Sequence, residues 1–172
     1  MKCQAITDYG QSLQEIEVSE PSPKESEVLV EVTHCGVCHS DVHFHDGFFD
    51  LGADKKLDVR EARPTPFTLG HEIEGVVKAI GPQVRGVQVG ERKVVYPWIG
   101  CGNCNDCENN REHLCNGRAL GVNLPGGFAT NCLVPHERYC LNADGISSGL
   151  AGTYMCSGIT AYSALKYLYK GN

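Results

Sequence analysis

The sequence predicts a mainly β fold with short helices, organised as a barrel or sandwich of strands with a four-cysteine lobe and a C-terminal helix. Three observations predict it. Short β-branched runs alternate with turns in a chain of 172 residues that contains 20 glycines. Four cysteines fall within residues 101–115, and apolar residues adopt a helical period only from residue 155 onward. The length fits one domain that can bury its own core.

Strands are predicted where β-branched residues gather between glycine, proline or aspartate turns. The strand at residues 28–33 leads directly into residues 35–38, where functional groups would stand on a rigid scaffold. We expect Ser40 or Asp41 to cap a short helix at that point. The predicted strands lie at residues 2–7, 13–18, 28–33, 70–81, 87–95, 126–134 and 138–141.

The segment at residues 48–68 is predicted to be an irregular loop, which Pro64 and Pro66 terminate. A loop of this length inside a compact domain is usually functional or mobile. It is either a lid over a site or plain surface, and the sequence leaves both interpretations open. Six charged residues are expected to be exposed on it: Lys55, Lys56, Asp58, Arg60, Glu61 and Arg63.

The last segment is predicted to be a helix with Cys156 in its first turn. Lys166 and Lys170 near its end suit the negative end of the helix dipole. The residues that recur at helical spacing are Met155, Ile159, Tyr162, Leu165 and Tyr169.

Composition limits the partners and the compartment. A net charge of −6 disfavours nucleic acid and anionic membranes as partners, and no apolar run reaches the roughly 18 residues of a membrane span. Residues 1–7 lack the apolar core of a signal peptide, so a cytoplasmic location is expected. In that reducing compartment, the ten cysteines are interpreted as metal ligands or buried thiols before disulfides.

Residues 38–43 concentrate reactive groups: one thiol, one hydroxyl, one carboxyl and two imidazoles. Cysteine thiolate and neutral histidine are preferred zinc donors. The hydroxyl of Ser40 and the imidazole of His43 are suited to move a proton away from a molecule bound at such a metal.

Four cysteines within fifteen residues predict a closed tetrahedral zinc site that stabilises the lobe. An iron–sulfur or rubredoxin-like iron site uses similar donors and remains the alternative. A nucleic-acid-binding zinc ribbon is disfavoured, because Asp106, Glu108 and Glu112 offset Arg111 and Arg118. The cysteines are Cys101, Cys104, Cys107 and Cys115.

A second, dispersed set of donors comprises Cys38, His71 and Cys156. Three protein donors would leave the fourth position of a zinc ion open, as in catalytic sites. Spacing alone does not connect Cys156 to the other two, and a lone cysteine at a helix start is equally a small buried apolar residue.

Four motifs in order then resemble one family. Residues 70–84 match the zinc signature GHE-x2-G-x5-G-x2-V of the zinc-containing medium-chain alcohol dehydrogenases. Residues 38–43 are similar to that family's first-ligand motif, residues 101–115 have its structural-zinc spacing, and residues 155–162 resemble its third-ligand helix. The chain is identified as a member of this family, as its catalytic, GroES-like N-terminal domain.

The resemblance implies two zinc ions per chain. Cys38, His71 and Cys156 match the ligands of the catalytic zinc. The ligands of the structural zinc match Cys101, Cys104, Cys107 and Cys115.

The resemblance also assigns roles around the catalytic zinc. Ser40 matches the hydroxyl that takes the proton of the alcohol, and His43 matches the outer histidine of the same relay. Asp41 matches the carboxylate that orients the ligand His71. Glu72 matches the acid behind the zinc, which is thought to aid ligand exchange.

The implied reaction is the oxidation of a primary or secondary alcohol to an aldehyde or ketone, with hydride transfer to NAD(P). The zinc supplies Lewis acidity for it. His39 matches the position that contacts the cofactor pyrophosphate. Trp98 is either a wall of the substrate cleft or a packing aromatic.

One departure from the family concerns the cofactor. No G-x-G-x-x-G follows a strand and opens a helix, so the Rossmann domain is expected to be absent. The expected division is a GroES-like catalytic domain at residues 1–152, with the structural zinc lobe at 98–118, and a connecting helix at 153–172. Activity alone would be weak or nil, and no oligomeric state is implied. The alternative is a stand-alone zinc-binding β-barrel with an interaction or metal-holding role.

Overall fold

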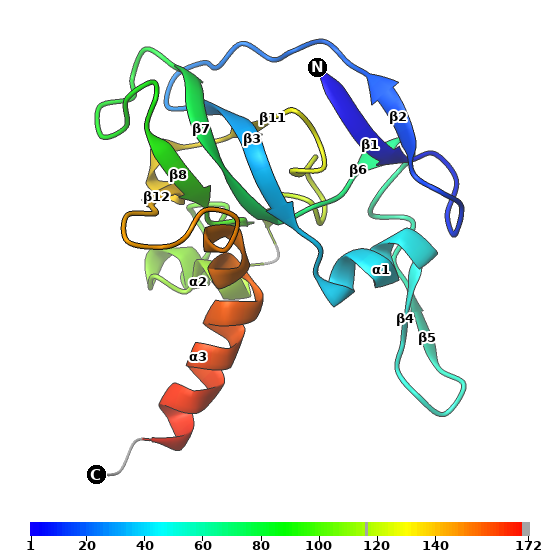
Figure 1. Cartoon of the computed structure of the whole chain (residues 1–172). Helices are drawn as coiled ribbons and strands as arrows, with labels where there is room; N and C mark the ends of the chain where they lie inside the picture. Colours follow the sequence, from blue (N-terminus) through cyan, green and yellow to red (C-terminus); the bar gives the residue numbers. More distant parts are fainter. Residues whose placement is uncertain (116, 170–172) are drawn as a thin grey trace.

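A five-stranded antiparallel sheet forms the centre of the molecule. The structure, a computed structural model, describes residues 1–115 and 117–169. The strand order of the sheet is β11-β3-β7-β8-β12, as Figure 1 shows. β-Branched residues dominate these strands, because their side chains pack well on a pleated surface. The strands are β3 (Val28–Gly36), β7 (Glu72–Ile80), β8 (Arg92–Val95), β11 (Asn131–Val134) and β12 (Cys140–Asn142).

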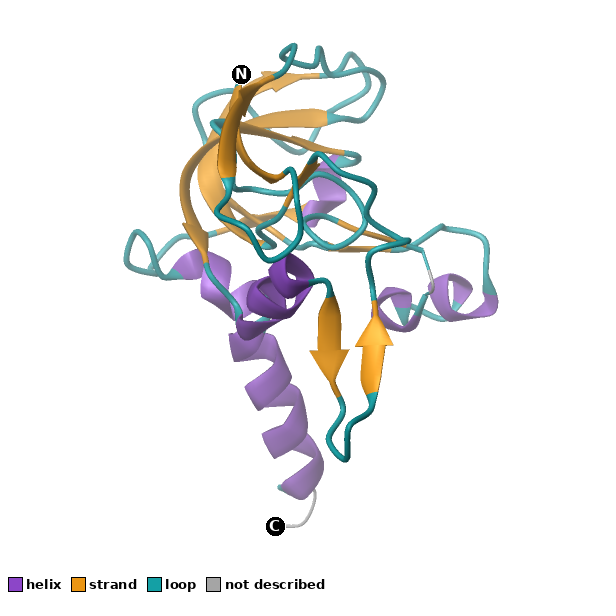
Figure 2. Ribbon diagram, turned by 90° about the vertical axis from the view of Figure 1, so that its right-hand side faces the viewer, coloured by secondary structure: helices purple, strands orange, loops and turns teal. Residues whose placement is uncertain are grey.

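A smaller sheet continues from this one. It has the order β2-β1-β6, formed by β1 (Lys2–Ile6), β2 (Gln14–Glu17) and β6 (Phe67–Thr68). Backbone hydrogen bonds from residues 128–130 reach β1 on one side and β3 on the other, and thereby join the two sheets. Figure 2 shows the strands curving around a shared interior. The predicted mainly β fold with short helices is confirmed.

The interior is filled by apolar side chains in two clusters. The larger lies within the five-stranded sheet and its connections, and the smaller joins the N-terminal sheet to the first helix. Each fully buried valine or leucine contributes about 1.5–3 kcal/mol relative to an exposed one. The smaller cluster is Ile6, Phe44, Phe67 and Leu69. The larger includes Val28, Val30, Ile73, Val77, Val95, Leu120, Cys132, Val134, Tyr139 and Cys140.

The first helix, α1 (His39–Asp46), begins two or three residues earlier than the capping prediction implied. Its N-cap residue is Cys38, not Ser40 or Asp41. Asp41 lies inside the first turn, where its carboxylate accepts the backbone N–H of Cys38 at 2.9 Å. The carboxylate thus satisfies one of the N–H groups that a helix start leaves unpaired.

The segment at residues 48–68 is more regular than predicted. It contains a hairpin of β4 (Phe48–Asp50) and β5 (Lys56–Asp58), which projects from the body near α1. The expected exposure of Arg63 is also wrong, because this residue is 5% exposed. Its guanidinium lies 3.9 Å from the centre of the Phe44 ring and donates to the backbone oxygen of Val59. These contacts offset the free-energy cost of burying the charged guanidinium.

The C-terminal helix, α3 (Ser157–Leu168), follows a 3-10 turn, η3 (Ala151–Met155). Cys156 therefore lies just before the helix and not in its first turn. The residues of the predicted apolar face, Ile159, Tyr162 and Leu165, are exposed. Figures 1 and 2 both show α3 leaving the body of the molecule. Residues 170–172 of the expected connecting helix, which include Lys170, lie outside the described residues.

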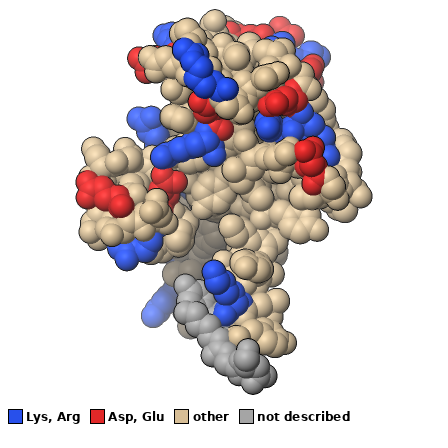
Figure 3. All heavy atoms as spheres, turned by 90° about the vertical axis from the view of Figure 1, so that its left-hand side faces the viewer, with Lys and Arg blue, Asp and Glu red and all other residues tan. Residues whose placement is uncertain are grey.

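The remaining elements are short. The cysteine lobe contains α2 (Asn105–Glu108) and a 3-10 turn, η1 (Glu112–Leu114), beside a two-stranded sheet of β9 (Trp98–Ile99) and β10 (Arg118–Ala119). A further 3-10 turn, η2 (Glu137–Tyr139), precedes β12. Acidic and basic side chains are interspersed on the face drawn in Figure 3. No helix in the described part of the chain has the length and apolar character needed to cross a membrane.

Candidate metal centres

Three donors from distant parts of the chain meet at one end of the central sheet. Cys38 follows β3 and His71 precedes β7, and the antiparallel register that pairs Gly36 with Glu72 brings both donors to the same end. Cys156 arrives there from η3. The ligand atoms of these three residues lie within 4.8 Å of one another, and the two sulfurs are 3.8 Å apart. The structure thus unites a set that spacing alone could not connect.

The imidazole of His71 is 0% exposed and has one partner. Its Nδ1 lies 3.2 Å from the carboxylate of Asp41, whereas its Nε2 is buried without a hydrogen-bond partner among the described residues. A buried polar atom without a partner is costly unless a ligand satisfies it. With two cysteine sulfurs beside it, this nitrogen belongs to a donor set that suits zinc.

Electrostatics at this cluster favour a thiolate at Cys38 and a protonated imidazole at His71. Burial opposes ionisation of Cys38, but the backbone N–H and hydroxyl of Ser40 and the His71 imidazole outweigh it and lower the pKa of the thiol. Burial also lowers the pKa of His71, yet Asp41 and Cys156 raise it overall, to about 11. Zinc would bind the neutral imidazole, so its binding would be coupled to loss of a proton from His71.

Glu72 lies behind Cys156 and is 3% exposed. Its carboxylate accepts the hydroxyl of Ser157 at 3.1 Å and the backbone N–H of Ser157 at 3.4 Å. The acid is thereby fastened to the residue that follows Cys156.

The expected proton relay is only partly assembled. Ser40 lies beside Cys38, whose pKa it helps to lower. The His43 ring contacts the rings of His39, at 4.7 Å, and Phe49, at 4.6 Å. No hydrogen bond joins Ser40 to His43 within the described residues. His39 is exposed at the first position of α1.

The four cysteines of the lobe form a second group of donors. Their sulfurs lie within 4.8 Å of one another, including Cys104 and Cys107 at 3.6 Å. Backbone N–H groups, first that of Asn103, lower the pKa of Cys101 to about 7, which favours thiolate. Four converging sulfurs fill a tetrahedral shell and leave no position for substrate.

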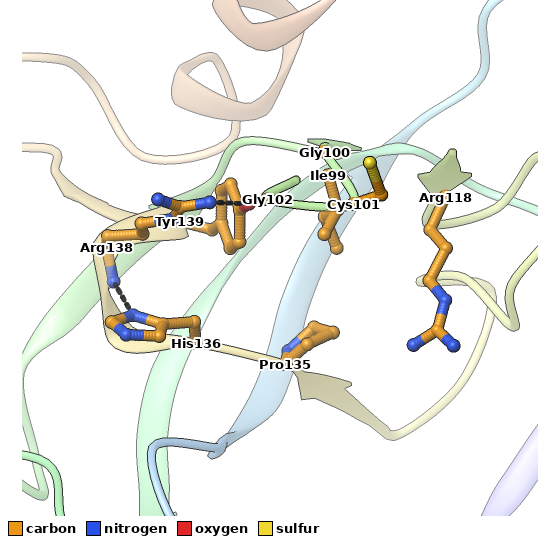
Figure 4. Close-up of a pocket in the computed structure, with 9 residues that line it drawn as sticks. All are labelled: Ile99, Gly100, Cys101, Gly102, Arg118, Pro135, His136, Arg138 and Tyr139. Atoms are coloured by element: carbon orange, nitrogen blue, oxygen red, sulfur yellow. Dashed lines mark hydrogen bonds between the residues drawn. The ribbon is translucent and has the colours of Figure 1, made fainter. Parts of the chain in front are cut away.

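An open pocket of about 350 Å³ lies beside this lobe, away from Cys38 and His71. Figure 4 shows its side chains separated from one another and not converging on one point. The guanidinium of Arg138 is already bonded to Glu112 at 2.6 Å and to the Tyr139 hydroxyl at 2.6 Å. The side chains that line this pocket therefore do not form a further group of metal donors.

Two residues near the first cluster have contacts that the sequence did not reveal. The indole N–H of Trp98 donates to the backbone oxygen of Met155 at 3.1 Å, and its ring lies 6.0 Å from that of His71. Glu74 is 1% exposed and bonds the segment that leads to Cys156. Its signal in the sequence is a second glutamate on the same face of β7 as Glu72, within a mostly apolar strand.

Known proteins that share the sequence pattern and the fold of this chain are longer than it is. The NAD-dependent alcohol dehydrogenase of Sulfurisphaera tokodaii is 39% identical over 168 residues, which are 96% of this chain and 47% of that protein. The chain thus spans about half the length of the curated relatives it matches.

Two solved structures share the fold. The cobalt- and zinc-bound thermostable alcohol dehydrogenase of Pyrobaculum aerophilum superimposes with a TM-score of 0.80 at 27% identity, over 97% of this chain and 48% of that one. The acetophenone reductase of Geotrichum candidum, in complex with NAD, gives 0.81 at 28% identity, over 96% and 47%.

The family comparison agrees with these likenesses. The model of the alcohol dehydrogenase GroES-like domain matches residues 24–145, a span that includes Cys38, His71 and the whole cysteine lobe. This span is more than half of the chain. The chain therefore belongs to the family of alcohol dehydrogenase GroES-like domains.

Proposed function

We propose that this chain is the catalytic half of a zinc-dependent alcohol dehydrogenase that oxidises a primary or secondary alcohol with hydride transfer to NAD(P). The names of the relatives support the oxidoreductase class. The solved relative that binds cobalt and zinc supports the metal. Since the chain spans only about half of these proteins, the hydride acceptor would be held mainly by another domain.

The observation that carries the proposal is the cluster of Cys38, His71 and Cys156 around the buried, unpartnered Nε2 of His71. Two thiolates and one imidazole would bind zinc and leave a fourth position for the alcohol. Bound zinc supplies Lewis acidity, which makes the hydroxyl of the alcohol more acidic.

The side chains of the site would divide the remaining work. Asp41 holds Nδ1 of His71, so that Nε2 faces the metal position. The hydroxyl of Ser40 accepts the proton of the alcohol, and His43 passes it towards solvent. His39 would approach the cofactor pyrophosphate.

The four-cysteine lobe would hold the structural zinc. We place the lobe at residues 98–118 within a catalytic domain of residues 1–152, and assign residues 153–172 to a helix that connects to the cofactor domain. The ten cysteines, six of them in the two donor groups, suit the reducing cytoplasm.

Metal analysis combined with a single-turnover assay tests the proposal. We expect two zinc ions per chain and little or no NADH formed from an alcohol and NAD by the chain alone, because hydride transfer requires a positioned nicotinamide. Addition of the separately produced cofactor-binding half of an alcohol dehydrogenase should raise the amount of NADH formed.

Three results would contradict the proposal. Iron in place of zinc would contradict the metal assignment. A single zinc per chain would contradict the two-site arrangement. Two zinc ions with no alcohol-dependent signal under any of these conditions would favour the stand-alone metal-holding barrel.

A further inference from the structure

An ion pair between the buried Glu74 and the partly exposed Arg92 fastens the segment that precedes Cys156. Arg92 Nε donates to Glu74 Oε1 at 2.8 Å, and the other guanidinium nitrogen on that side lies 2.7 Å from the same oxygen. The carboxylate also accepts three bonds from residues 148–151, each 3.1–3.2 Å long. The donors are the hydroxyl of Ser148 and the backbone N–H groups of Gly149 and Ala151.

Arg92 extends the same attachment in the other direction. Its Nη1 donates to the backbone oxygens of Ala143, at 3.1 Å, and Ile146, at 2.9 Å. The ion pair therefore binds residues 143 and 146 through Arg92, and residues 148–151 through Glu74. This stretch runs from β12 into η3 and contains no β-strand. A buried carboxylate is retained at such a place only when donors surround it, as they do here.

Two carboxylates on one face of β7 hold the two ends of the segment at residues 148–157. Glu74 binds its beginning, and Glu72 binds Ser157 at its end. Between them, the backbone of Gly152 packs so closely that a Cβ there would lie 2.3 Å from the backbone oxygen of Glu72. Cys156 lies inside this doubly held segment, and His71 precedes the same strand.

The rest of the local structure supports Cys156 through apolar packing and not through further charged side chains. α3 follows it and leaves the body of the molecule with its apolar residues exposed. Trp98 binds the backbone of Met155, and Ala151 and Met155 also pack with Val94 of β8 in a small apolar cluster.

We propose that Glu74, paired with Arg92, is a positioning residue that places the Cys156 sulfur opposite His71 and Cys38. This inference rests on the proposed metal site and adds a residue to it. Glu74 touches neither metal nor substrate, so it acts through the segment of residues 148–157. Its loss should loosen one donor of the three and leave the four-cysteine lobe unaffected.

The test compares two pairs of matched variants of the whole chain. Glu74→Gln removes the carboxylate charge that pairs with Arg92. Its control, Glu20→Gln, removes an exposed carboxylate that pairs with Lys78, a residue of the same strand as Glu74. Ser148→Ala removes the hydrogen bond from an exposed serine hydroxyl to Glu74. Its control, Ser147→Ala, removes the hydroxyl of the neighbouring serine. The serine pair keeps the test decisive if Glu74→Gln fails to fold.

Two measurements separate the sites. Zinc release to a chromophoric chelator gives the dissociation rate of each zinc. Cadmium-113 NMR of the cadmium-loaded chain distinguishes a metal with four sulfur ligands from one with two sulfurs and a nitrogen. For Glu74→Gln we expect one zinc to dissociate at least about tenfold faster and only the mixed-ligand resonance to shift or broaden. Ser148→Ala should produce a smaller change of the same kind. Neither control variant should change the rate of zinc release or the mixed-ligand resonance.

The outcomes also separate this inference from the proposed function. If the unaltered chain shows no mixed-ligand resonance, the proposed metal site fails and this inference fails with it. If that resonance is present and is unchanged in both Glu74→Gln and Ser148→Ala, only the positioning role is overturned. Faster release of both zinc ions to the same extent, or lower thermal stability with unchanged zinc release, would likewise assign Glu74 a general structural role.

Discussion

The carboxylate of Asp41 lies 3.2 Å from Nδ1 of His71, with both side chains buried. The same carboxylate accepts the backbone N–H groups of Cys38 and Gly70, so it joins the segments that carry two of the metal donors. A hydrogen-bonded carboxylate fixes the ring orientation and the tautomer of a ligand histidine.

Asp41→Asn should therefore weaken zinc binding at the cluster of His71 by about 10–100-fold, the usual effect of losing such a partner. Competition with a chromophoric chelator measures the affinity. Asp46→Asn, an exposed substitution on the same helix beside His45, is the matched control and should leave it unchanged. Equal affinities for the two variants would show that Asp41 does not orient His71.

Cys104→Ser should lower the stability of the chain by at least about 2 kcal/mol, because a structural metal contributes directly to folding free energy. His43→Ala should cost less than about 1 kcal/mol, since this half-buried ring packs against His39 and Phe49 without a hydrogen bond among the described residues. Thermal unfolding followed by circular dichroism compares them. Equal melting temperatures for the two variants would contradict the structural role assigned to the lobe.

Gly152→Ala should destabilise the chain by about 1–3 kcal/mol, because the new Cβ would meet backbone and not a flexible side chain. The strain falls between Glu72 and Cys156, so zinc should also be lost from the mixed-ligand site. Urea unfolding and zinc content are the measurements. Gly86→Ala, whose nearest neighbour is the end of the Glu137 side chain at 3.3 Å, should be close to neutral.

The stability that Glu74 contributes should depend on pH. Burial raises the pKa of this carboxyl, but the Arg92 guanidinium and the N–H groups of Gly149 and Ala151 outweigh it and hold the pKa below its ordinary 4.5. A carboxyl with a depressed pKa in the folded state stabilises the fold above its unfolded pKa, and this contribution is lost as pH falls through the folded pKa.

The free energy of unfolding should thus differ between the unaltered chain and Glu74→Gln by about 2 kcal/mol at neutral pH. The difference should shrink below about pH 4.5. Urea titrations at several pH values give the two free energies. A difference that stays constant down to about pH 3 would show that the pKa of Glu74 is not depressed in the folded chain.

The sequence predicted best what depends on neighbouring residues. The four-cysteine lobe follows from spacing, because all of its donors lie within fifteen residues. Most strands follow from β-branched runs between glycines. Cys156, by contrast, is 118 residues from Cys38, so only the resemblance to a family connected them.

The features that the sequence did not predict depend on contacts distant in the chain. The hairpin of β4 and β5 has mostly exposed residues, and thus no alternation of apolar and polar positions to reveal it. Arg63 is buried because a phenylalanine ring and a backbone oxygen receive it, and no sequence period encodes such partners. The helical period of α3 was recognised, but a period does not tell which partner covers the apolar face.

Trp98 is the only tryptophan of the chain. Its indole is bonded to the residue before Cys156, and its ring faces that of His71 at 6.0 Å. The tryptophan fluorescence of the chain therefore originates beside the mixed-ligand cluster. Titration with a paramagnetic quencher such as cobalt(II) would follow the filling of that site in real time without an attached label.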